Sequence, residues 1–448
     1  MHTDTSTAAG QAVLSDCYPA LDELTDAARQ LTARHPGLCT LRTLGTSRAG
    51  RPLHLLTIGR TDDHVLVVSG AHADEFSGRA SILELAHRVL AQPGLHSATT
   101  WNFLLCLDPD GAHLAEDSRH ARTLPHYFAT FFRPAAEEQP EWAPAIGANL
   151  PESRILLDLI DDLRPRLQFS LHSTDVGGTF IQTTRDLPGL AEPFAKSAAD
   201  HGLPLDSGSF DTFWLEEPGP AVFVMDPHDI DRQESTTGML TAHPGDGAET
   251  TETGVRATTW FTPQRHGGDT LIIEVPVWAS QPDPARPTPD PGTRLATCAA
   301  HLRRHGQVIT ELLETAGPHL ADTPLLRAVH TPLTALNQLA DQWDPGVGGQ
   351  RLLGSGLMTP ARLEGIELWA HRLPVRTAAL LRRALDPTHA RTAPVADRID
   401  HLLREWIGEY EQRFRPAWIP VADQAAHQAN TVLAAAEVTR TRPSRAVH

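Results

Sequence analysis

Lysine is nearly absent from this chain of 448 residues, and tyrosine, methionine and cysteine are scarce. Lys196 is the single lysine, so almost all of the 38 basic residues are arginine, and the 55 acidic residues give a formal net charge of −17. Nucleic acid and anionic membranes attract positively charged surfaces, so an acidic chain is a poor match for either. We therefore expect no nucleic-acid partner and no membrane partner.

The few cysteines and the lack of long apolar runs narrow the protein class further. The four cysteines are widely spaced and form no Cys-x-x-Cys pair, which argues against a thiolate metal site and a disulfide framework. No apolar run reaches the roughly 18 residues of a membrane helix, and the first residues lack the positive start and apolar core of a signal peptide. We expect a cytoplasmic protein with reduced thiols.

Up to about residue 280, short apolar runs alternate with helical patterns. Strand-like runs occupy residues 39–44, 53–58, 65–68, 101–107, 167–171 and 270–275, and helical periodicity occupies 15–33, 78–90 and 152–163. The first two runs are joined by a short segment with glycine and proline, which is typical of a hairpin. This order predicts an α/β fold with a mixed central sheet flanked by helices.

The rest of the chain has a different pattern. Residues 279–293 contain five prolines and are typical of a stiff linker. Helical periodicity then fills residues 294–316, 322–342, 360–386, 396–413 and 420–438. We predict four parts: an N-terminal lead and helix (1–36), a catalytic domain (37–280), a proline-rich linker (281–293) and a mostly helical C-terminal domain (294–448). Residues 236–259 are polar enough to form a flap.

The apolar run at 65–68 is typical of a strand that is buried on both faces, and it leads into His72 and Glu75. An imidazole and a carboxylate three residues apart at a strand end can reach the same ion, which is half of a zinc site. A pair of surface-loop residues is the alternative. The same spacing recurs in His113 and Glu116, where no strand precedes it.

Two later strands supply the missing groups. The run at 167–171 is followed by His172, which would be a third ligand, and the run at 270–275 carries Glu274. A catalytic zinc site needs three protein ligands and one open position, so these residues predict a site for one Zn²⁺, although another divalent metal would accept the same ligands. Burying an unpaired carboxylate is costly, so Glu274 needs a partner, and a structural salt bridge is the alternative to catalysis.

Several motifs in this order resemble the M14 zinc carboxypeptidase family, the metallocarboxypeptidases. They are Gly-x-Ser-x-x-Gly-Arg-Pro at 45–52, Gly-x-His-x-x-Glu at 70–75, Asp-Pro-Asp-Gly at 108–111 where the family has Asn-Pro-Asp-Gly, His-Ser at 172–173, and Glu274. The resemblance covers residues 38–278. It implies a carboxypeptidase-like fold and a zinc hydrolase of the metallopeptidase type, in which Glu274 acts as general base and acid toward metal-activated water.

The chain departs from the family where the substrate is held. The family's Asn-Arg pair, which grips the terminal carboxylate of the substrate, has no counterpart, and no tyrosine lies shortly before Glu274. Because arginine is the natural carboxylate clamp, we expect Arg122 to polarise the scissile carbonyl and Arg119 and Arg133 to bind substrate, with Arg133 as the clamp. Solvated loop arginines are the alternative.

The resemblance implies a zinc-dependent, carboxypeptidase-like hydrolase, a protease in the broad sense, that cleaves an amide bond in a small peptide or peptide-like metabolite. Two alternatives stay open. One is deacylation of an N-acyl amino acid, as in the related succinylglutamate desuccinylase and aspartoacylase branch. The other is a metal-bound binding module without turnover, whose helical tail contacts a partner. The sequence leaves the oligomeric state and the role of the helical domain undecided.

Overall fold

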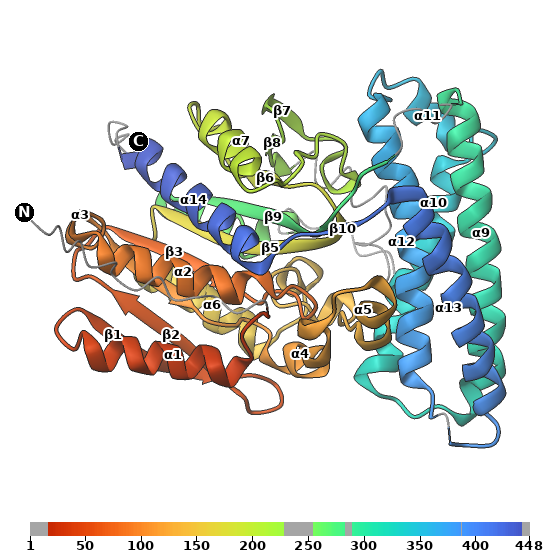
Figure 1. The fold of residues 1–448 in the computed structure, drawn as a ribbon, viewed down its shortest axis with the longest axis horizontal. Helices are drawn as coiled ribbons and strands as arrows, with labels where there is room; N and C mark the ends of the chain where they lie inside the picture. Colours follow the sequence, from red (N-terminus) through yellow and green to blue (C-terminus); the bar gives the residue numbers. More distant parts are fainter. Residues whose placement is uncertain (1–16, 228–253, 283–288, 387, 441–448) are drawn as a thin grey trace, which may run out of the picture.

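The computed structural model describes residues 17–227, 254–282, 289–386 and 388–440. A mixed sheet runs through it, helices cover both faces of the sheet, and a layer of long helices stands at one end (Figure 1). The predicted α/β class with a helical C-terminal region is thereby confirmed. The predicted N-terminal lead and most of the predicted flap at 236–259 lie outside the described residues, as does part of the linker.

The sheet has ten strands in the order β1-β2-β4-β3-β5-β9-β6-β8-β7, and β10 pairs with β9. The strands β4, β3, β5 and β9 are parallel to one another, whereas β2 and β6 run antiparallel to their neighbours in this central group. β1 and β2 form the predicted hairpin. The bounds are β1 Cys39–Thr46, β2 Pro52–Ile58, β3 His64–Ser69, β4 Thr100–Leu104, β5 Leu167–Gly177, β6 Phe180–Thr183, β7 Glu216–Gly219, β8 Val222–Val224, β9 Asp269–Ala279 and β10 Ala417–Trp418.

Helices of the described residues fall into two groups. Those within or against the sheet domain are α1 Leu21–Arg34, α2 Ser77–Ala91, α3 Pro93–Ala98, α4 Pro109–Leu114, α5 Leu124–Thr130, α6 Pro151–Leu163, α7 Ala191–Asp200 and α14 Val421–Arg440. Those of the helical layer are α9 Pro291–Ala316, α10 Pro324–Trp343, α11 Gly349–Leu353, α12 Pro360–Ala384 and α13 Ala393–Phe414. None of the described helices is long and apolar enough to cross a membrane.

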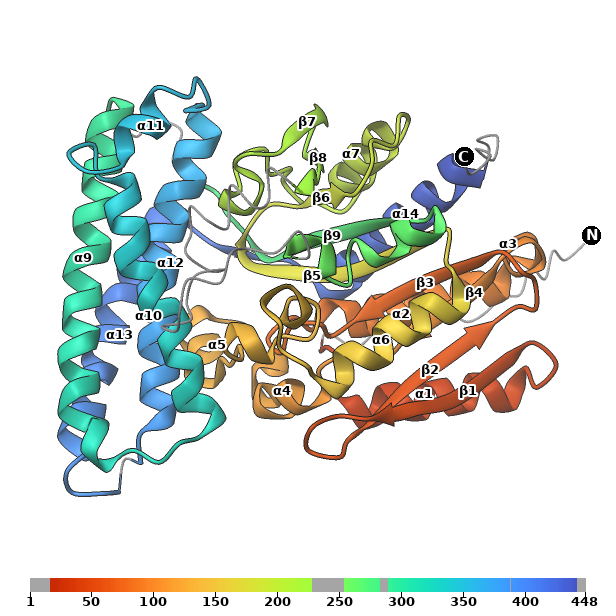
Figure 2. The ribbon, with the colours of Figure 1, turned by 180° about the vertical axis from the view of Figure 1, so that it is seen from behind.

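Strand β3 shows why the sheet is buried on both faces. Val65 and Val67 pack into a core with α1, α2 and α14, while Leu66 and Val68 point the other way and pack against α6. Successive strand residues face opposite sides, so an unbroken apolar run needs cover on both. Figure 2 shows α6 on its face of the sheet. This packing holds the ends of β3, β5 and β9 in fixed positions.

The long helices begin at local capping signals. The side chains of Asp290, Thr323 and Thr359 each accept a hydrogen bond from a backbone N–H of the first turn of α9, α10 and α12, and each is followed by proline. The helices then pack through one continuous apolar core that also includes α5 and residues near the strand ends. The helical layer is therefore joined to the sheet domain by packing.

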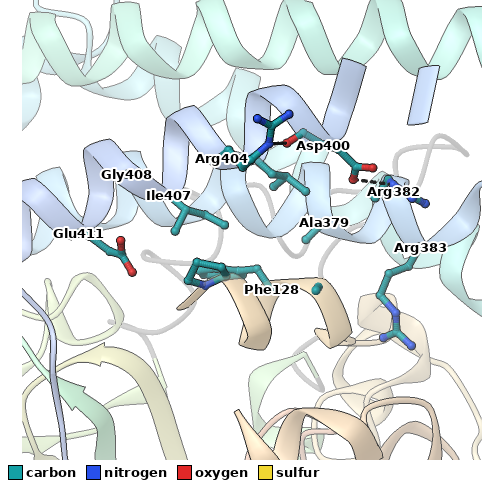
Figure 3. A pocket seen from close by; sticks show the side chains of 12 residues that line it. Phe128, Ala379, Arg382, Arg383, Asp400, Arg404, Ile407, Gly408 and Glu411 are labelled. Carbon is teal, nitrogen blue, oxygen red and sulfur yellow. Dashed lines mark hydrogen bonds and ion pairs between the residues drawn. The ribbon is translucent and has the colours of Figure 1, made fainter. Parts of the chain in front are cut away.

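A cavity of about 480 Å³ lies between α5, α12 and α13 (Figure 3). Phe128, Ala379 and Ile407 line it, and at its edge Arg382 Nε lies 2.7 Å from an Asp400 carboxylate oxygen. Its lining contains no histidine. It includes no complete metal-ligand group found among the described residues, and it is separate from the cavity that contains His72 and His172.

The last helix leaves the helical layer and returns to the sheet. α14 packs on α2 and α7, and Gln428 donates hydrogen bonds to the carbonyls of His172 (2.8 Å) and Ile273 (3.0 Å) on β5 and β9. The predicted helical domain at 294–448 therefore includes one helix that packs as part of the sheet domain. The predicted domain boundaries otherwise stay a prediction.

Candidate active site

The turn after β3 presents the first two candidate ligands. Gly70 has a φ of +63°, and a Cβ there would lie 2.6 Å from Cys106 Sγ, so glycine is required by both its backbone conformation and the close approach. The chain then turns tightly, with the Glu75 N–H donating to the His72 carbonyl at 3.3 Å. As a result His72 and Glu75 both face the ends of the neighbouring strands.

The pairing of β5 with β9 presents the other two groups. These strands run parallel, and His172 lies directly opposite Glu274 in the register. β3 ends at Ser69, which pairs with Leu171, so His172 and Glu274 lie just beyond the end of β3 and beside the turn that follows it. The structure therefore brings the four side chains together, but β5 and β9 run on to Gly177 and Ala279, so His172 and Glu274 lie in the middle of these strands and not at their ends as the sequence predicted.

Three of these side chains form a group that could hold a metal ion. One ligand atom from each of His72, Glu75 and His172 lies within 4.8 Å of the other two. His172 Nδ1 is 2.9 Å from Glu75 Oε2 and 3.9 Å from Glu274 Oε1. His72 Nδ1 is buried without a hydrogen-bond partner, as expected of a nitrogen that binds a metal ion. Two imidazoles and a carboxylate with one open side fit a zinc site.

Glu141 fixes the orientation of His172, although the sequence analysis did not single it out. The ring nitrogen Nε2 of His172 is 3.0 Å from Glu141 Oε2. Because a carboxylate only accepts, Nε2 donates, which leaves Nδ1, the nitrogen that faces Glu75, as the one that would bind an ion. Ser170 (2.6 Å) and the Trp260 indole N–H (2.8 Å) hold the same carboxylate.

The charges in this buried group are strongly coupled. Burial, with help from Arg133, lowers the pKa of His72 to about 3, so this ring is neutral. Burial opposes ionisation of Glu75, but His72, Arg133 and His172 outweigh it and lower the Glu75 pKa well below its usual range. Burial also opposes protonation of His172, yet Glu75 and Glu141 raise the His172 pKa well above its usual range. Without a metal, the positive charge of protonated His172 therefore offsets part of the negative charge of Glu75 and Glu141.

Glu274 differs from the other carboxylates of this group. Burial, followed by the negative charge of Glu75, raises the pKa of Glu274 to about 8. A positive ion beside it would favour the ionised form. Glu274 therefore has the environment of a proton-transfer group whose pKa a cation can tune.

Arg133 lies in the cavity, as the sequence analysis expected, but its guanidinium is already engaged. It donates to both oxygens of Asp74, at 2.8 and 3.1 Å, and also contacts Glu75. The Tyr127 hydroxyl donates to Asp74 at 3.1 Å and completes this network. Arg133 therefore orients the ligand Glu75, and a role as the carboxylate clamp stays a prediction.

Helix α12 brings two further arginines to the same cavity. Arg372 Nε lies 2.7 Å from Asp175, and Arg376 Nε donates to the other oxygen of Asp175 at 3.1 Å. Arg376 is also 3.9 Å from Asp74. Three guanidinium groups thus face three carboxylates, those of Asp74, Asp175 and Glu75.

The structure places the other two predicted arginines elsewhere, so their assignment is corrected. Arg119 donates to the Tyr18 carbonyl at 3.0 Å and pairs with Glu116. Arg122 stacks over Trp418, with its guanidinium carbon 4.2 Å from the ring centre. Both belong to the irregular segment after β4, whose short helices turn these side chains toward the N-terminal segment and β10, and neither lines the cavity.

The cavity that joins these groups has a volume of about 190 Å³. Its sheet side carries His72, Glu75, His172 and Glu274, and its helix side carries Arg372 and Arg376. Other lining residues include Arg133, Trp142, Trp260, Trp369 and Asp211. Burial raises the pKa of Asp211, although the positive charge of Arg372 opposes this shift.

Some of these residues carried a signal in the sequence and some did not. Trp369, Arg372 and Arg376 follow the spacing of one helix face, so their common direction could have been predicted once the helix was. Glu141 lies in an irregular segment without periodicity, and no local pattern marks it.

Part of the chain matches a known family. Residues 24–175 match the family model described as "Zinc carboxypeptidase", the M14 peptidases. The predicted resemblance is confirmed. Within the M14-like segment lie His72, Glu75 and His172, whereas Glu274 and the helical layer follow it. Among curated proteins, none matches the chain.

Solved structures of metallocarboxypeptidases show a distant likeness. The metallo-carboxypeptidase from Burkholderia cenocepacia is 17% identical with a TM-score of 0.32, and the alignment covers 56% of this chain and 58% of that one. Carboxypeptidase A from Helicoverpa armigera is 13% identical with a TM-score of 0.37, and the alignment covers 62% and 69%. This chain thus spans less than two thirds of the Burkholderia protein.

Proposed function

We propose that the protein is a zinc-dependent, carboxypeptidase-like hydrolase that cleaves an amide bond in a small substrate bearing a free carboxylate. The observation that carries this proposal is the convergence of His72, Glu75 and His172 within ligand distance, with Glu274 beside them. The M14 family match supports the hydrolase class.

The residues divide the chemistry between them. His72, Glu75 and His172 would hold the zinc ion, which supplies a Lewis acid that activates water and polarises the amide carbonyl. Glu274 takes a proton from the attacking water as the new C–O bond forms, and it passes that proton to the amine nitrogen as the C–N bond breaks. Glu141 keeps the His172 ring in the orientation that ligation requires.

The three cavity arginines account for the substrate class. They replace the Asn-Arg pair that the sequence lacks, because Arg133, Arg372 and Arg376 place guanidinium groups on the cavity wall. Guanidinium groups bind carboxylates through paired hydrogen bonds. When Glu75 binds the zinc ion, Asp74 and Asp175 balance only part of the charge of the three arginines, so an anionic substrate group completes the set.

The size of the cavity favours a small substrate. About 190 Å³ is below the roughly 300–1,000 Å³ of a drug-sized pocket. Trp142 and Trp260, whose ring centres lie 5.8 Å apart, and Trp369 from α12 close the walls. A dipeptide-sized molecule or an acylated amino acid fits such an enclosure better than a polypeptide. Nucleic acid and membranes are not expected as partners.

A substrate panel tests the proposal. Dipeptides, their C-terminal amides and N-acyl amino acids are incubated with zinc-loaded and with chelator-treated protein. We expect zinc-dependent release of the terminal amino acid from free dipeptides, and turnover about 100-fold slower for the amides, because a buried charge loses its partner. Equal turnover of the amides would contradict carboxylate recognition.

The other two functions give different outcomes on the same panel. Turnover of N-acyl amino acids alone identifies a deacylase. Binding of zinc without hydrolysis of any compound identifies a binding module. Either result overturns the carboxypeptidase proposal.

A further inference from the structure

A second group of metal-ligating side chains lies in the helical layer. His301 and His305 are one turn apart on α9, and Glu409 belongs to α13. One ligand atom from each lies within 4.8 Å of the other two, as in the group of His72, Glu75 and His172. Histidines four residues apart on a helix share one face, so a single ion can reach both.

The ring of His305 is already held in an orientation suited to ligation. Its Nδ1 lies 2.7 Å from the carbonyl oxygen of His301. A carbonyl only accepts, so Nδ1 carries the proton and Nε2 keeps its lone pair. A backbone carbonyl that accepts from the second ring nitrogen is the usual support of a histidine that binds a metal. This hydrogen bond is independent of the distances that define the group.

Further aromatic side chains pack around His301 and His305. The His301 ring centre is 3.9 Å from that of His305 and 4.4 Å from that of His371 on α12, and Trp406 packs edge-on against His305 at 4.4 Å. His305 is buried whereas Glu409 is exposed, so an ion could enter from solvent. Three imidazoles therefore gather beside one carboxylate.

The nearby charges do not all favour a cation. Glu405, one turn before Glu409, adds negative charge near His305, whereas Arg304 adds positive charge near both histidines of α9. Imidazole ligands bind through a lone pair rather than through net charge. A transition-metal ion therefore suits this site better than Ca²⁺ or Mg²⁺, which prefer oxygen ligands.

We propose that His301, His305 and Glu409 form a second metal site that binds one divalent transition-metal ion. Two imidazoles and a carboxylate suit Zn²⁺, with the remaining positions open to solvent. Such an ion links α9 to α13 and stabilises the helical layer. The site is separate from the proposed catalytic centre in the residues that form it, and it does not depend on the proposed activity.

Counting the bound metal tests this proposal in the full-length protein. Protein freed of metal by chelation is titrated with Zn²⁺, and the metal is counted by elemental analysis after dialysis. We expect two equivalents for the unaltered protein and one for His72→Gln. Glu409→Gln, on an exposed side chain that the fold does not need, should weaken one of the two sites at least about tenfold.

Further variants assign the second equivalent to this site. His301→Gln should also weaken one site, and in His72→Gln/Glu409→Gln both sites should be lost or weakened. The matched control is His319→Gln/His389→Gln, a histidine pair with ring centres 5.6 Å apart, for which we expect two equivalents. Co²⁺ in place of Zn²⁺ adds a visible spectrum, whose contribution from the second site should disappear in His301→Gln.

Two results would overturn the proposal. One is a single equivalent of Zn²⁺ in the unaltered protein that His72→Gln abolishes. The other is a second equivalent whose affinity is the same in Glu409→Gln and His301→Gln. Loss of hydrolytic activity in the substrate panel would leave both measurements intact, so the two proposals fail independently.

Discussion

The cavity of the candidate active site has two walls, which are built in different ways. The sheet wall carries His172 and Glu274 on paired strands and the His72 turn directly after a third strand, so the backbone network of the sheet sets their positions. The helix wall carries Arg372 and Arg376 on α12, and these side chains are set by buried contacts with Asp175. We infer that the sheet wall carries out the reaction and the helix wall selects the substrate.

This division predicts that changes on the sheet wall lower turnover. Glu274→Gln should reduce kcat by about 10²–10⁴-fold because the proton acceptor is lost, while Zn²⁺ still binds. Steady-state kinetics and a metal count measure both quantities. Glu216→Gln, on an exposed strand residue outside the cavity, is the matched control and should leave both unchanged. Near-native kcat in Glu274→Gln would remove this residue from the mechanism.

Behind the sheet wall, Glu141→Gln should weaken Zn²⁺ binding by about 10–100-fold. The amide cannot accept from His172, Ser170 and Trp260 together, so the ligand ring loses its fixed orientation. Competition with a chelator of known affinity measures the change. Glu137→Gln, in the same segment, should bind zinc as the unaltered protein does, and equal affinity in the two variants would exclude Glu141 as a positioning residue.

On the helix wall, Arg376→Lys should raise KM about tenfold and leave kcat nearly unchanged. The substitution keeps the charge but loses the planar fork that binds a carboxylate. Arg382→Lys on the same helix is the control, because Arg382 pairs with Asp400 away from this cavity. If kcat falls instead of KM rising, the helix wall takes part in the reaction and the division between the walls is wrong.

His427 on α14 lies outside both walls, so its substitution should change only stability. Burial, with help from His201, lowers its pKa to about 3 from the ordinary 6.5. Below pH 6.5 the unfolded chain binds a proton that the folded chain does not, so stability falls as the pH drops toward 3.

We therefore expect the unfolding free energy to decrease more steeply, as the pH drops, in the unaltered protein than in His427→Gln. Between pH 6 and pH 4, the slopes of unfolding free energy against pH should differ by the binding of one proton, which is about 1.4 kcal/mol per pH unit. Chemical denaturation at several pH values measures this slope. The exposed His113 provides the control His113→Gln, and an identical slope in all three proteins would contradict the prediction.

Most of the sheet wall could be predicted from the sequence. The apolar runs marked the buried strands β3, β5 and β9, and ligand-type residues stood in or directly after these runs, so local order along the chain carried the information, although β5 and β9 continue past His172 and Glu274. The Asp-Pro-Asp-Gly motif at 108–111 starts the short helix α4, because the Asp108 side chain accepts a hydrogen bond from the Gly111 N–H at 2.9 Å.

The helix wall could not be predicted in the same way. Helical periodicity located α12, but the partner of Arg376 is Asp175, 201 residues away, and only tertiary packing brings them together. Arg119 and Arg122 lie in the irregular segment that follows the Asp-Pro-Asp-Gly motif. The contacts of Tyr18 and Trp418, which hold them outside the cavity, also come from distant parts of the chain.

The position of α14 has a consequence for how the protein is made. Gln428 binds carbonyls of β5 and β9, yet a ribosome adds it only after all four long helices. Until α14 emerges from the exit tunnel, the side of α2 that contacts α14 is uncovered and the His172 carbonyl lacks its hydrogen bond from Gln428. The candidate active site should therefore take its final form only late in translation.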